Sequence, residues 1–186
     1  SSDLIKYTNN QNLDITTVAA NTGGNFAGTT NGLDTSATTG KTIDVKVSTG
    51  SLTLNSDVTT NTTGNVYLTA VTGISEVASG TPKITTGTLG MLVTGTGDID
   101  VNNANLVTTL GAKTASGNIK YTNNQNLNIT TVAANTGGNF AGTTNGLDTS
   151  ATTGKTVDVK VSTGSLTLNS DVTTNTTGNE IGRAHV

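Results

Sequence analysis

The stretch Lys41-Thr-Ile-Asp-Val-Lys-Val-Ser-Thr-Gly-Ser-Leu-Thr-Leu-Asn55 alternates apolar and polar side chains, and this alternation decides the fold class. A period of two is that of a half-buried β-strand, whose successive side chains point to opposite faces. Residues 48–50 interrupt the alternation with types that favour turns. Residues 57–60 add another short extended piece, so residues 41–64 predict three short strands joined by tight polar turns. The apolar positions of the quoted stretch are Ile43, Val45, Val47, Leu52 and Leu54.

The same alternation recurs along the rest of the chain, at residues 65–69, 84–93, 98–101 and 117–129. No window carries a sustained apolar stripe at i, i+3, i+4 and i+7, so no helix is predicted. Thr, Val and Ile are β-branched and suit a pleated strand. The sequence therefore predicts an all-β protein.

A long internal repeat organises these strands, because residues 5–65 recur at residues 119–179, an offset of 114. Two aligned positions differ: Asp14 becomes Asn128, and Ile43 becomes Val157. Such identity indicates a recent duplication, or a long array of which this chain is a window.

Strand-turn units divide this period into rungs. Starts near residues 65, 88, 118, 139 and 155 give five rungs of about 23 residues, and six rungs of about 19 residues also fit. The weakest regions, residues 25–40 and 139–154, contain few apolar residues beyond Phe26, Leu33, Phe140 and Leu147. We expect each of these regions to be a short rung or an outward loop.

The composition favours a β-solenoid in which each rung buries its apolar face on the next one. Thr, Asn and Gly number 43, 23 and 23 of the 186 residues. Thr suits outward strand positions, Gly and Asn suit turns, and Asn can stack into amide ladders. We predict that residues 1–179 form one solenoid segment of about eight rungs of roughly 19–24 residues. A β-sandwich is the alternative, because it also uses many short strands.

The composition also excludes several partners and sites. The chain has no Cys, which rules out disulfides and Cys-ligated metals. Its net charge of −3 argues against nucleic acid as a partner. No apolar run approaches the length of a membrane-spanning helix, so no membrane insertion is expected.

The last residues, 180–186, do not continue the repeat. They hold the only Arg and the only His of the chain, and residues 181–186 back-translate to a common sequencing adapter. The first copy carries Val66 where the second carries Glu180, and both residues have codons that begin with G. We interpret residues 180–186 as an adapter read through as protein and exclude them from functional reasoning.

Several segments resemble rungs of filamentous haemagglutinin-type exoproteins, notably residues 51–60, 64–73 and 95–101. These proteins are large bacterial surface adhesins, exported by two-partner secretion or as autotransporter passengers. The resemblance is one of style, Thr/Asn/Gly rungs with aliphatic alternation, and covers residues 3–179. It implies that the fold is a right-handed parallel β-helix. It also implies a protein that is secreted or lies at the cell surface, associated with the outer membrane of a Gram-negative bacterium. Its partner would be a surface or host ligand, either protein or glycan.

The sequence predicts no catalytic, cofactor-binding or metal site. Before residue 180 the chain has no His, Arg or Cys, so no Ser-His-Asp, Cys-His or His-metal site can be built. Residues 98–102 begin like a calcium loop but lack the Gly and Glu that an EF-hand needs. The carboxylates are spread about one per rung, as on a solvated outer face. They include Asp34, Asp44, Asp57 and their copies Asp148, Asp158 and Asp171.

These observations predict a non-catalytic stalk segment of an adhesin, whose partners include the neighbouring rungs of the same long chain. A β-helix carbohydrate-active enzyme is one alternative and would need clustered carboxylates. A self-assembling or ice-binding surface solenoid is another, and ice binding would need a flat array of Thr. The chain has three Tyr residues, Tyr7, Tyr67 and Tyr121. Each of them could pack at the end of a rung or contact a protein ligand.

Overall fold

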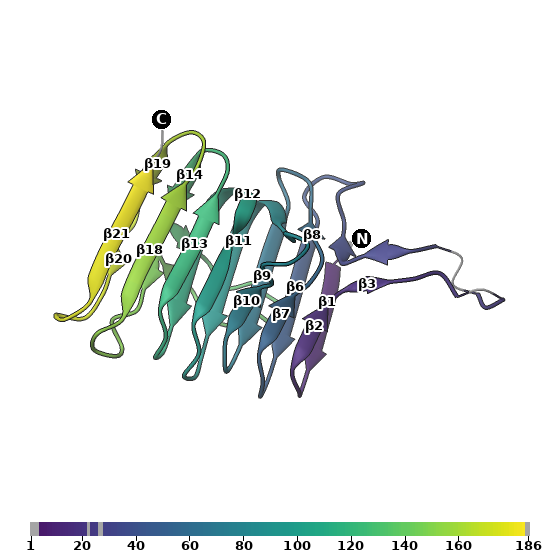
Figure 1. Cartoon of the computed structure of the whole chain (residues 1–186), viewed down its shortest axis with the longest axis horizontal. Helices are drawn as coiled ribbons and strands as arrows, with labels where there is room; N and C mark the ends of the chain where they lie inside the picture. Colours follow the sequence, from purple (N-terminus) through teal and green to yellow (C-terminus); the bar gives the residue numbers. More distant parts are fainter. Residues whose placement is uncertain (1–3, 22, 26–27, 185–186) are drawn as a thin grey trace.

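The chain forms a parallel β-helix in the computed structural model, which describes residues 4–21, 23–25 and 28–184 (Figure 1). Coils stack along the long axis from the N-terminal coil to the C-terminal one. Within the described residues every strand pairing is parallel except in two short hairpins. The prediction of an all-β solenoid is confirmed. No described segment is a helix that could cross a membrane.

The first face of the β-helix is a stack of five strands joined in parallel register. They are β1 (Leu4–Asn9), β6 (Thr42–Val47), β9 (Asn65–Ala70) and the C-terminal parts of β11 (Ile84–Val93) and β12 (Ile99–Thr114). Four short strands continue this face beyond β12. They are β14 (Leu127–Ile129), β17 (Leu147–Asp148), β19 (Leu166–Leu168) and β20 (Val172–Thr173).

The second face stacks seven strand segments in parallel, close to the expected eight rungs. They are β2 (Leu13–Ile15), β7 (Leu52–Leu54), β10 (Ile74–Glu76), the N-terminal part of β12, β13 (Ile119–Asn123), β18 (Thr156–Val161) and β21 (Asn179–Ala184). A shorter third face holds β5 (Leu33–Asp34), β8 (Val58–Thr59) and the N-terminal part of β11.

The two copies of the repeat use different faces. Strand β1 lies on the first face, whereas its copy β13 lies on the second. Along the first face the layers are Ile5, Ile43, Val66, Leu89 and Leu110. The offset of 114 residues therefore holds four coils and part of a fifth, so the second copy is rotated about the axis.

The predicted rung starts are corrected in two places. Starts at 65 and 88 coincide with layers of the first face, but the next layer begins at Thr109 and not near residue 118. The reason is β12, a strand of 16 residues that runs from the second face over the third, where Leu106 and Val107 pair with β11, to the first. No Gly or Pro interrupts it before Gly111. The predicted start at 139 lies in a hairpin outside the coil stack.

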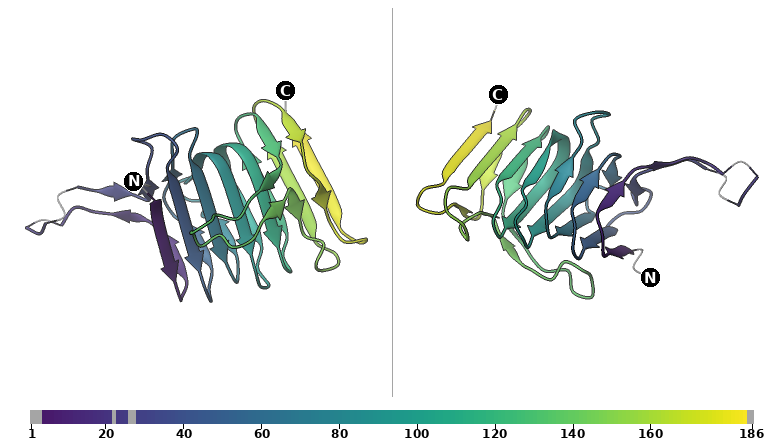
Figure 2. Two further views of the ribbon diagram at one scale, coloured as in Figure 1. Left: turned by 180° about the vertical axis from the view of Figure 1, so that it is seen from behind. Right: turned by 60° about the horizontal axis from the view of Figure 1, so that its bottom comes forward.

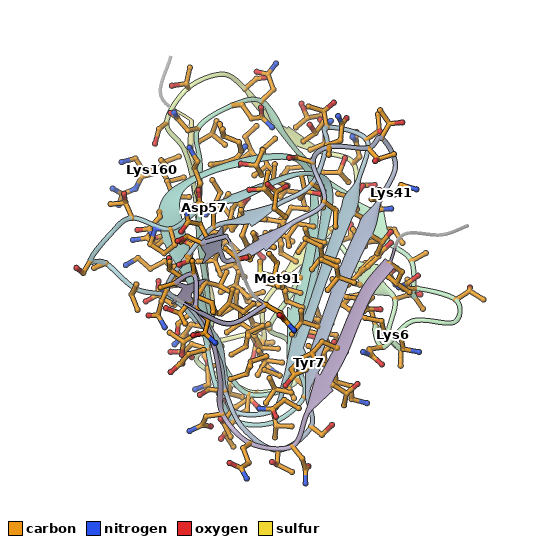
Figure 3. The ribbon with its side chains drawn as sticks, turned by 90° about the vertical axis from the view of Figure 1, so that its right-hand side faces the viewer. Lys6, Tyr7, Lys41, Asp57, Met91 and Lys160 are labelled. Atoms are coloured by element: carbon orange, nitrogen blue, oxygen red, sulfur yellow. The ribbon has the colours of Figure 1, made fainter. Side chains whose placement is uncertain are left out.

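The core is a set of inward rows that run along the axis. One row consists of Val45, Leu68, Met91 and Ala112, all essentially inaccessible to solvent. Viewed along the axis, Met91 lies in the interior while Lys6, Lys41 and Lys160 lie at the periphery (Figure 3). Medium aliphatic side chains fill this interior because each layer must fit the next at the strand spacing of about 4.8 Å.

The C-terminal coil exposes a repeat position that a middle coil buries. The two copies of this position allow a matched test of how much burial contributes to stability. Leu54 is fully buried, whereas its copy Leu168 is 58% exposed at the C-terminal end. We expect Leu54→Ala to lower the free energy of unfolding by about 2–5 kcal/mol, because it leaves a cavity. We expect Leu168→Ala to lower it by less than about 1 kcal/mol. Urea unfolding followed by circular dichroism measures both, and equal losses would contradict the buried position of Leu54.

Candidate interaction site: two identical arms and an outer stripe

Two hairpins leave the coil stack. The first arm, residues 17–31, contains the antiparallel strands β3 (Thr17–Val18) and β4 (Thr30–Asn31). The second arm, residues 131–145, contains β15 (Thr131–Val132) and β16 (Thr144–Asn145). The arms have the same sequence. An outward loop was expected at residues 25–40 and 139–154, and an outward segment is present in each region. Each one begins earlier than predicted, and the chain rejoins the stack at Leu33 and Leu147. Phe26 lies outside the described residues.

A single outward row of the first face forms the surface under the second arm. Strand register aligns Lys6 with Asp44, Asp44 with Tyr67, Tyr67 with Gly90, and Gly90 with Gly111. We call this row the stripe. Successive layers of the β-helix supply one residue each, so the stripe runs parallel to the long axis. Its two glycines lower the surface next to the root of the second arm.

The second arm packs its apolar side chains on the glycine end of the stripe. Phe140 is fully buried and Val132 is 3% exposed. The rings of Phe140 and Tyr67 lie 5.0 Å apart between centroids with an interplanar angle of 31°. A methyl group on Gly90 would come within 3.0 Å of Phe140, Tyr67 and Val132, so the arm fits only over a residue without a side chain.

Polar contacts hold the tip of the second arm on the other end of the stripe. The Asp44 Oδ2 atom accepts hydrogen bonds from the Asn135 side chain at 2.6 Å and from the backbone N–H groups of Asn139 and Phe140 at 2.6 and 3.3 Å. Lys6 donates to the carbonyl of Gly137 at 2.9 Å. Asp44 is fully buried, and three donors on its Oδ2 atom offset part of the cost of removing the carboxylate from water, while Oδ1 has no partner among the described residues.

The first arm has no such contacts among the described residues. Val18 is 53% exposed, although its copy Val132 is 3% exposed. Figure 2 displays the contrast, with the second arm lying back across the central strands and the first arm pointing past the N-terminal coil. One sequence therefore occupies two environments, and the surface beneath it makes the difference.

The predicted carboxylates do not come together. Asp44 is buried under the second arm, and Asp57 accepts a hydrogen bond from the backbone of Lys83 at 3.0 Å. Hydrogen bonds from the side chain and backbone of Ser36 lower the pKa of Asp34. Burial raises the pKa of Asp148, but hydrogen bonds from Lys113 and Ser150 outweigh it and leave that pKa lowered. The described residues include no group of three acidic or His side chains that could hold a metal ion.

The segment that begins like a calcium loop serves a turn instead. The Asp98 Oδ1 atom accepts hydrogen bonds from the backbone and side-chain nitrogens of Asn118, at 2.7 and 3.2 Å. Asn102 accepts a hydrogen bond from Thr122 at 2.7 Å. These oxygens join neighbouring coils and do not converge on one point.

The tyrosines divide between the interior and the stripe. Tyr121 is fully buried in the core, donates to Asn123 at 3.2 Å, and has a pKa raised well above its usual value by burial. Its copy Tyr7 occupies an inward row of the first coil, where it is 48% exposed because no described coil covers it. Only Tyr67 faces outward, under Phe140. Tyr121 therefore packs inside the core, whereas the interpretation of Tyr7 stays a prediction.

The outward rows carry mixed polar residues. One row of the first face reads Thr8, Lys46, Thr69, Leu92 and Lys113. Lys113 forms an ion pair of 2.9 Å with Asp148. This row is not the regular Thr array that the ice-binding alternative requires.

Sequence reasoning missed one partly buried carboxylate, Glu76. It pairs with Leu54 in register and therefore points inward, where its Oε2 atom accepts hydrogen bonds from the Asn103 backbone at 2.8 Å and the Asn105 side chain at 3.3 Å. Its other oxygen has no partner. Burial raises the pKa of Glu76 to about 7. The alternation from Ile74 could have located it, because Glu76 follows Ile74 by two residues.

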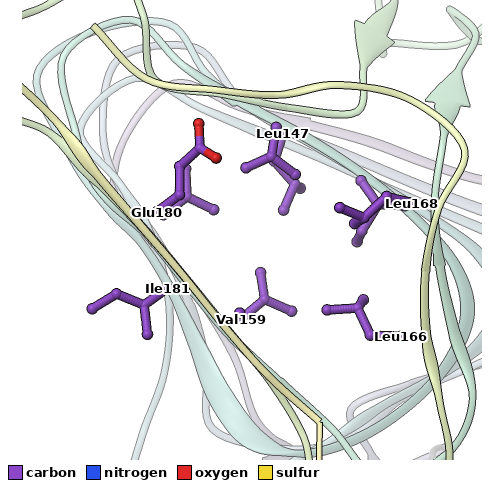
Figure 4. Close-up of a pocket in the computed structure, with 10 residues that line it drawn as sticks. Leu147, Val159, Leu166, Leu168, Glu180 and Ile181 are labelled. Carbon is purple, nitrogen blue, oxygen red and sulfur yellow. The ribbon is translucent and has the colours of Figure 1, made fainter. Parts of the chain in front are cut away.

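The C-terminal coil ends in an open apolar cavity (Figure 4). Leu147, Val159, Leu166 and Leu168 line it, and Glu180 reaches it from β21. In the first copy the same position is Val66, which is fully buried. A carboxylate where the repeat has a core valine agrees with a foreign origin of residues 180–186, which stays a prediction.

The docked arm predicts a difference between two copies of one aspartate. The chain has no cysteine, so Val132→Cys introduces a single thiol on the side of the second arm that packs against the stripe. We expect Asp44→Asn to speed its labelling by a thiol reagent roughly 10- to 100-fold, because hydrogen bonds to a charged group contribute about 1.5–3 kcal/mol. Asp158→Asn, the same change in the second copy, is the control. Equal labelling rates in the two variants would contradict the role of Asp44.

Glu76 predicts a pH dependence of stability. The unfolded pKa is 4.5 and the folded pKa about 7, so the folded chain keeps this proton longer as the pH rises. Its contribution to folding stability is fully present below pH 4.5, and about 3 kcal/mol of it is lost as the pH rises from 4.5 through 7. We expect Glu76→Gln to raise stability at pH 8 more than at pH 5 in urea unfolding. Asp14→Asn, which the second copy carries as Asn128, controls for the lost charge, and a gain independent of pH would refute the prediction.

Comparison with known proteins found no match to any family model, curated protein or solved structure.

Proposed function

We propose that this chain is a structural and adhesive stalk segment of a large bacterial adhesin, exposed at the cell surface or secreted. The observation that carries the proposal is the continuous stacking across the boundary between the repeat copies. Strand β12 pairs with β11 on one side and with both β13 and β14 on the other. A coil stack that continues through a repeat boundary can be lengthened by adding copies, which is the property a stalk needs.

The surface chemistry supports a stalk over the carbohydrate-active enzyme that the sequence left open. Asp34, Asp57, Asp148 and Asp44 serve a turn, a neighbouring coil, an ion pair and the arm contact, one at a time. Asp98, Asp100 and Asp158 line one open surface pocket with Lys120, where Asp98 accepts hydrogen bonds from Asn118. A glycosidase needs two carboxyl groups held across one bond. We infer that binding by such a stalk would come from weak contacts repeated along its length, where multivalency raises avidity without a strong single site.

The stalk proposal predicts how length depends on the number of copies. We expect each added copy of residues 5–118 to lengthen the particle by about 20–25 Å, because it adds between four and five layers at a spacing of about 4.8 Å. Small-angle X-ray scattering of chains with one to four added copies measures this increment. A constant cross-section is the internal control.

Two results would overturn the proposal. A particle that grows in all dimensions with added copies would exclude a stalk. Antibodies against the chain that label producing cells only after permeabilisation would exclude surface exposure. In that second case the elongated shape would be retained and only the adhesin role would be excluded. The scattering experiment therefore tests the shape, and the antibody experiment tests the location.

A further inference from the structure

The two arms have the same sequence, yet the second is docked and the first is not. The second arm lies on strands that precede it in the chain, from β12 back to β1. Its contacts cross the boundary of the repeat, because the arm belongs to the second copy and the whole stripe belongs to the first, residues 5–118. Docking therefore joins one copy of the repeat to the copy before it.

The first arm already has the shape of the docked one where both are described. In the first arm Gly24 donates to the carbonyl of Asn21 at 3.0 Å, and in the second Gly138 donates to Asn135 at 2.9 Å. At the arm roots, Thr17 contacts Ser56 at 3.0 Å and Thr131 contacts Ser170 at 3.2 Å. The described root and turn of the first arm are therefore already ordered as in the docked arm, which lowers the entropy that a partner would have to fix in those parts.

The direction of the first arm points to its partner. It leaves the first coil and extends along the axis past the N-terminal end, whereas the second arm lies over the coils that precede its own (Figures 1 and 2). Both arms thus run toward the N-terminal side of their own coil. Beyond the first coil no described residue provides a stripe, which leaves Val18 at 53% exposure.

We propose that the first arm is a docking element whose partner is another copy of the repeat, stacked on the N-terminal side. The partner presents Lys, Asp, Tyr, Gly and Gly in register on one outward row. The glycines receive the valine and the aromatic residue of the arm, the Asp accepts the Asn and backbone donors of the tip, and the Lys binds a tip carbonyl. This inference needs only the repeat and its arm, and does not depend on the stalk role proposed above.

A copy in the same rod is the partner that the contacts favour over a second molecule. In a second molecule the stripe is already covered by that molecule's own second arm, which fully buries Asp44. That arm has the same sequence and is tethered beside the stripe, so its effective concentration exceeds that of a free competitor. An upstream copy has no such competitor for its stripe.

The test uses single thiols in the full chain and in a chain extended by one copy of residues 5–118 placed directly before residue 5. Val18→Cys reports on the first arm and Val132→Cys on the second. In the native chain we expect Val18→Cys to react at least about tenfold faster than Val132→Cys, because labelling requires an accessible thiol. In the extended chain we expect the rate at Val18→Cys to fall to that of Val132→Cys.

Two further variants assign the effect to the stripe. Asn in place of the aspartate equivalent to Asp44 in the added copy should restore fast labelling of Val18→Cys. The same change at Asp158 should not. Circular dichroism and slow labelling of Val132→Cys confirm that each extended chain is folded.

The proposal fails if the labelling of Val18→Cys stays fast in an extended chain that is folded. The added copy would then present a stripe that does not bind the first arm. It also fails if labelling of Val18→Cys in the native chain slows as protein concentration rises. That result would make a second molecule the partner, and sedimentation velocity would then detect the association.

Discussion

Parallel stacking of one coil on the next is the constraint on which the rest of this structure depends. The backbone N–H and C=O groups of each coil point along the axis, so only the neighbouring coil can satisfy them. The same stacking places each inward side chain on the one below it, as in the row Val45, Leu68, Met91 and Ala112. The burial of an inward residue therefore depends on whether another coil covers it as much as on its residue type. Tyr7 and Tyr121, which are copies of each other, differ in exposure because a coil covers one and no described coil covers the other.

The sequence was sufficient for the fold class because strand alternation is a local property. The pattern around Ile43 and Leu52 specifies which side faces inward without knowledge of any neighbour. The number of layers in one repeat is different, since it depends on where the chain bends. Strand β12 bends between its second-face and first-face parts with a register shift between Val101 and Asn105, where buried Asn105 and Asn123 stack in place of a Gly turn. That corner carries Asn102, Asn103 and Asn105 but no Gly or Pro, and the strand continues through it. The sequence therefore placed rung starts near residues 118 and 139, and it did not predict the rotation of the second copy.

The sequence predicted the outward segment of the candidate site, but not the surface on which that segment packs. The weak hydrophobicity of residues 139–154 indicated an outward segment, but whether it docks depends on the row beneath it. Gly90 and Gly111 lie far from each other in sequence and become one surface only through register. The spacing of Asp44 predicted a solvated carboxylate, yet the arm buries it completely. Interactions that join distant layers carry no local pattern, so sequence alone treats such residues as an ordinary polar face.

The docked arm changes how the stack can come apart. In a solenoid each coil normally contacts its two neighbours, so separation at one interface breaks only local contacts. The second arm binds Gly111 and Gly90 near its root and Asp44 and Lys6 near its tip, and these residues belong to four different layers. Separation of any two of these layers must therefore also detach the tip from Asp44 or the apolar residues from the glycines. Contacts that skip layers couple the opening of neighbouring coils, so we expect the layers beneath the arm to open together rather than one at a time.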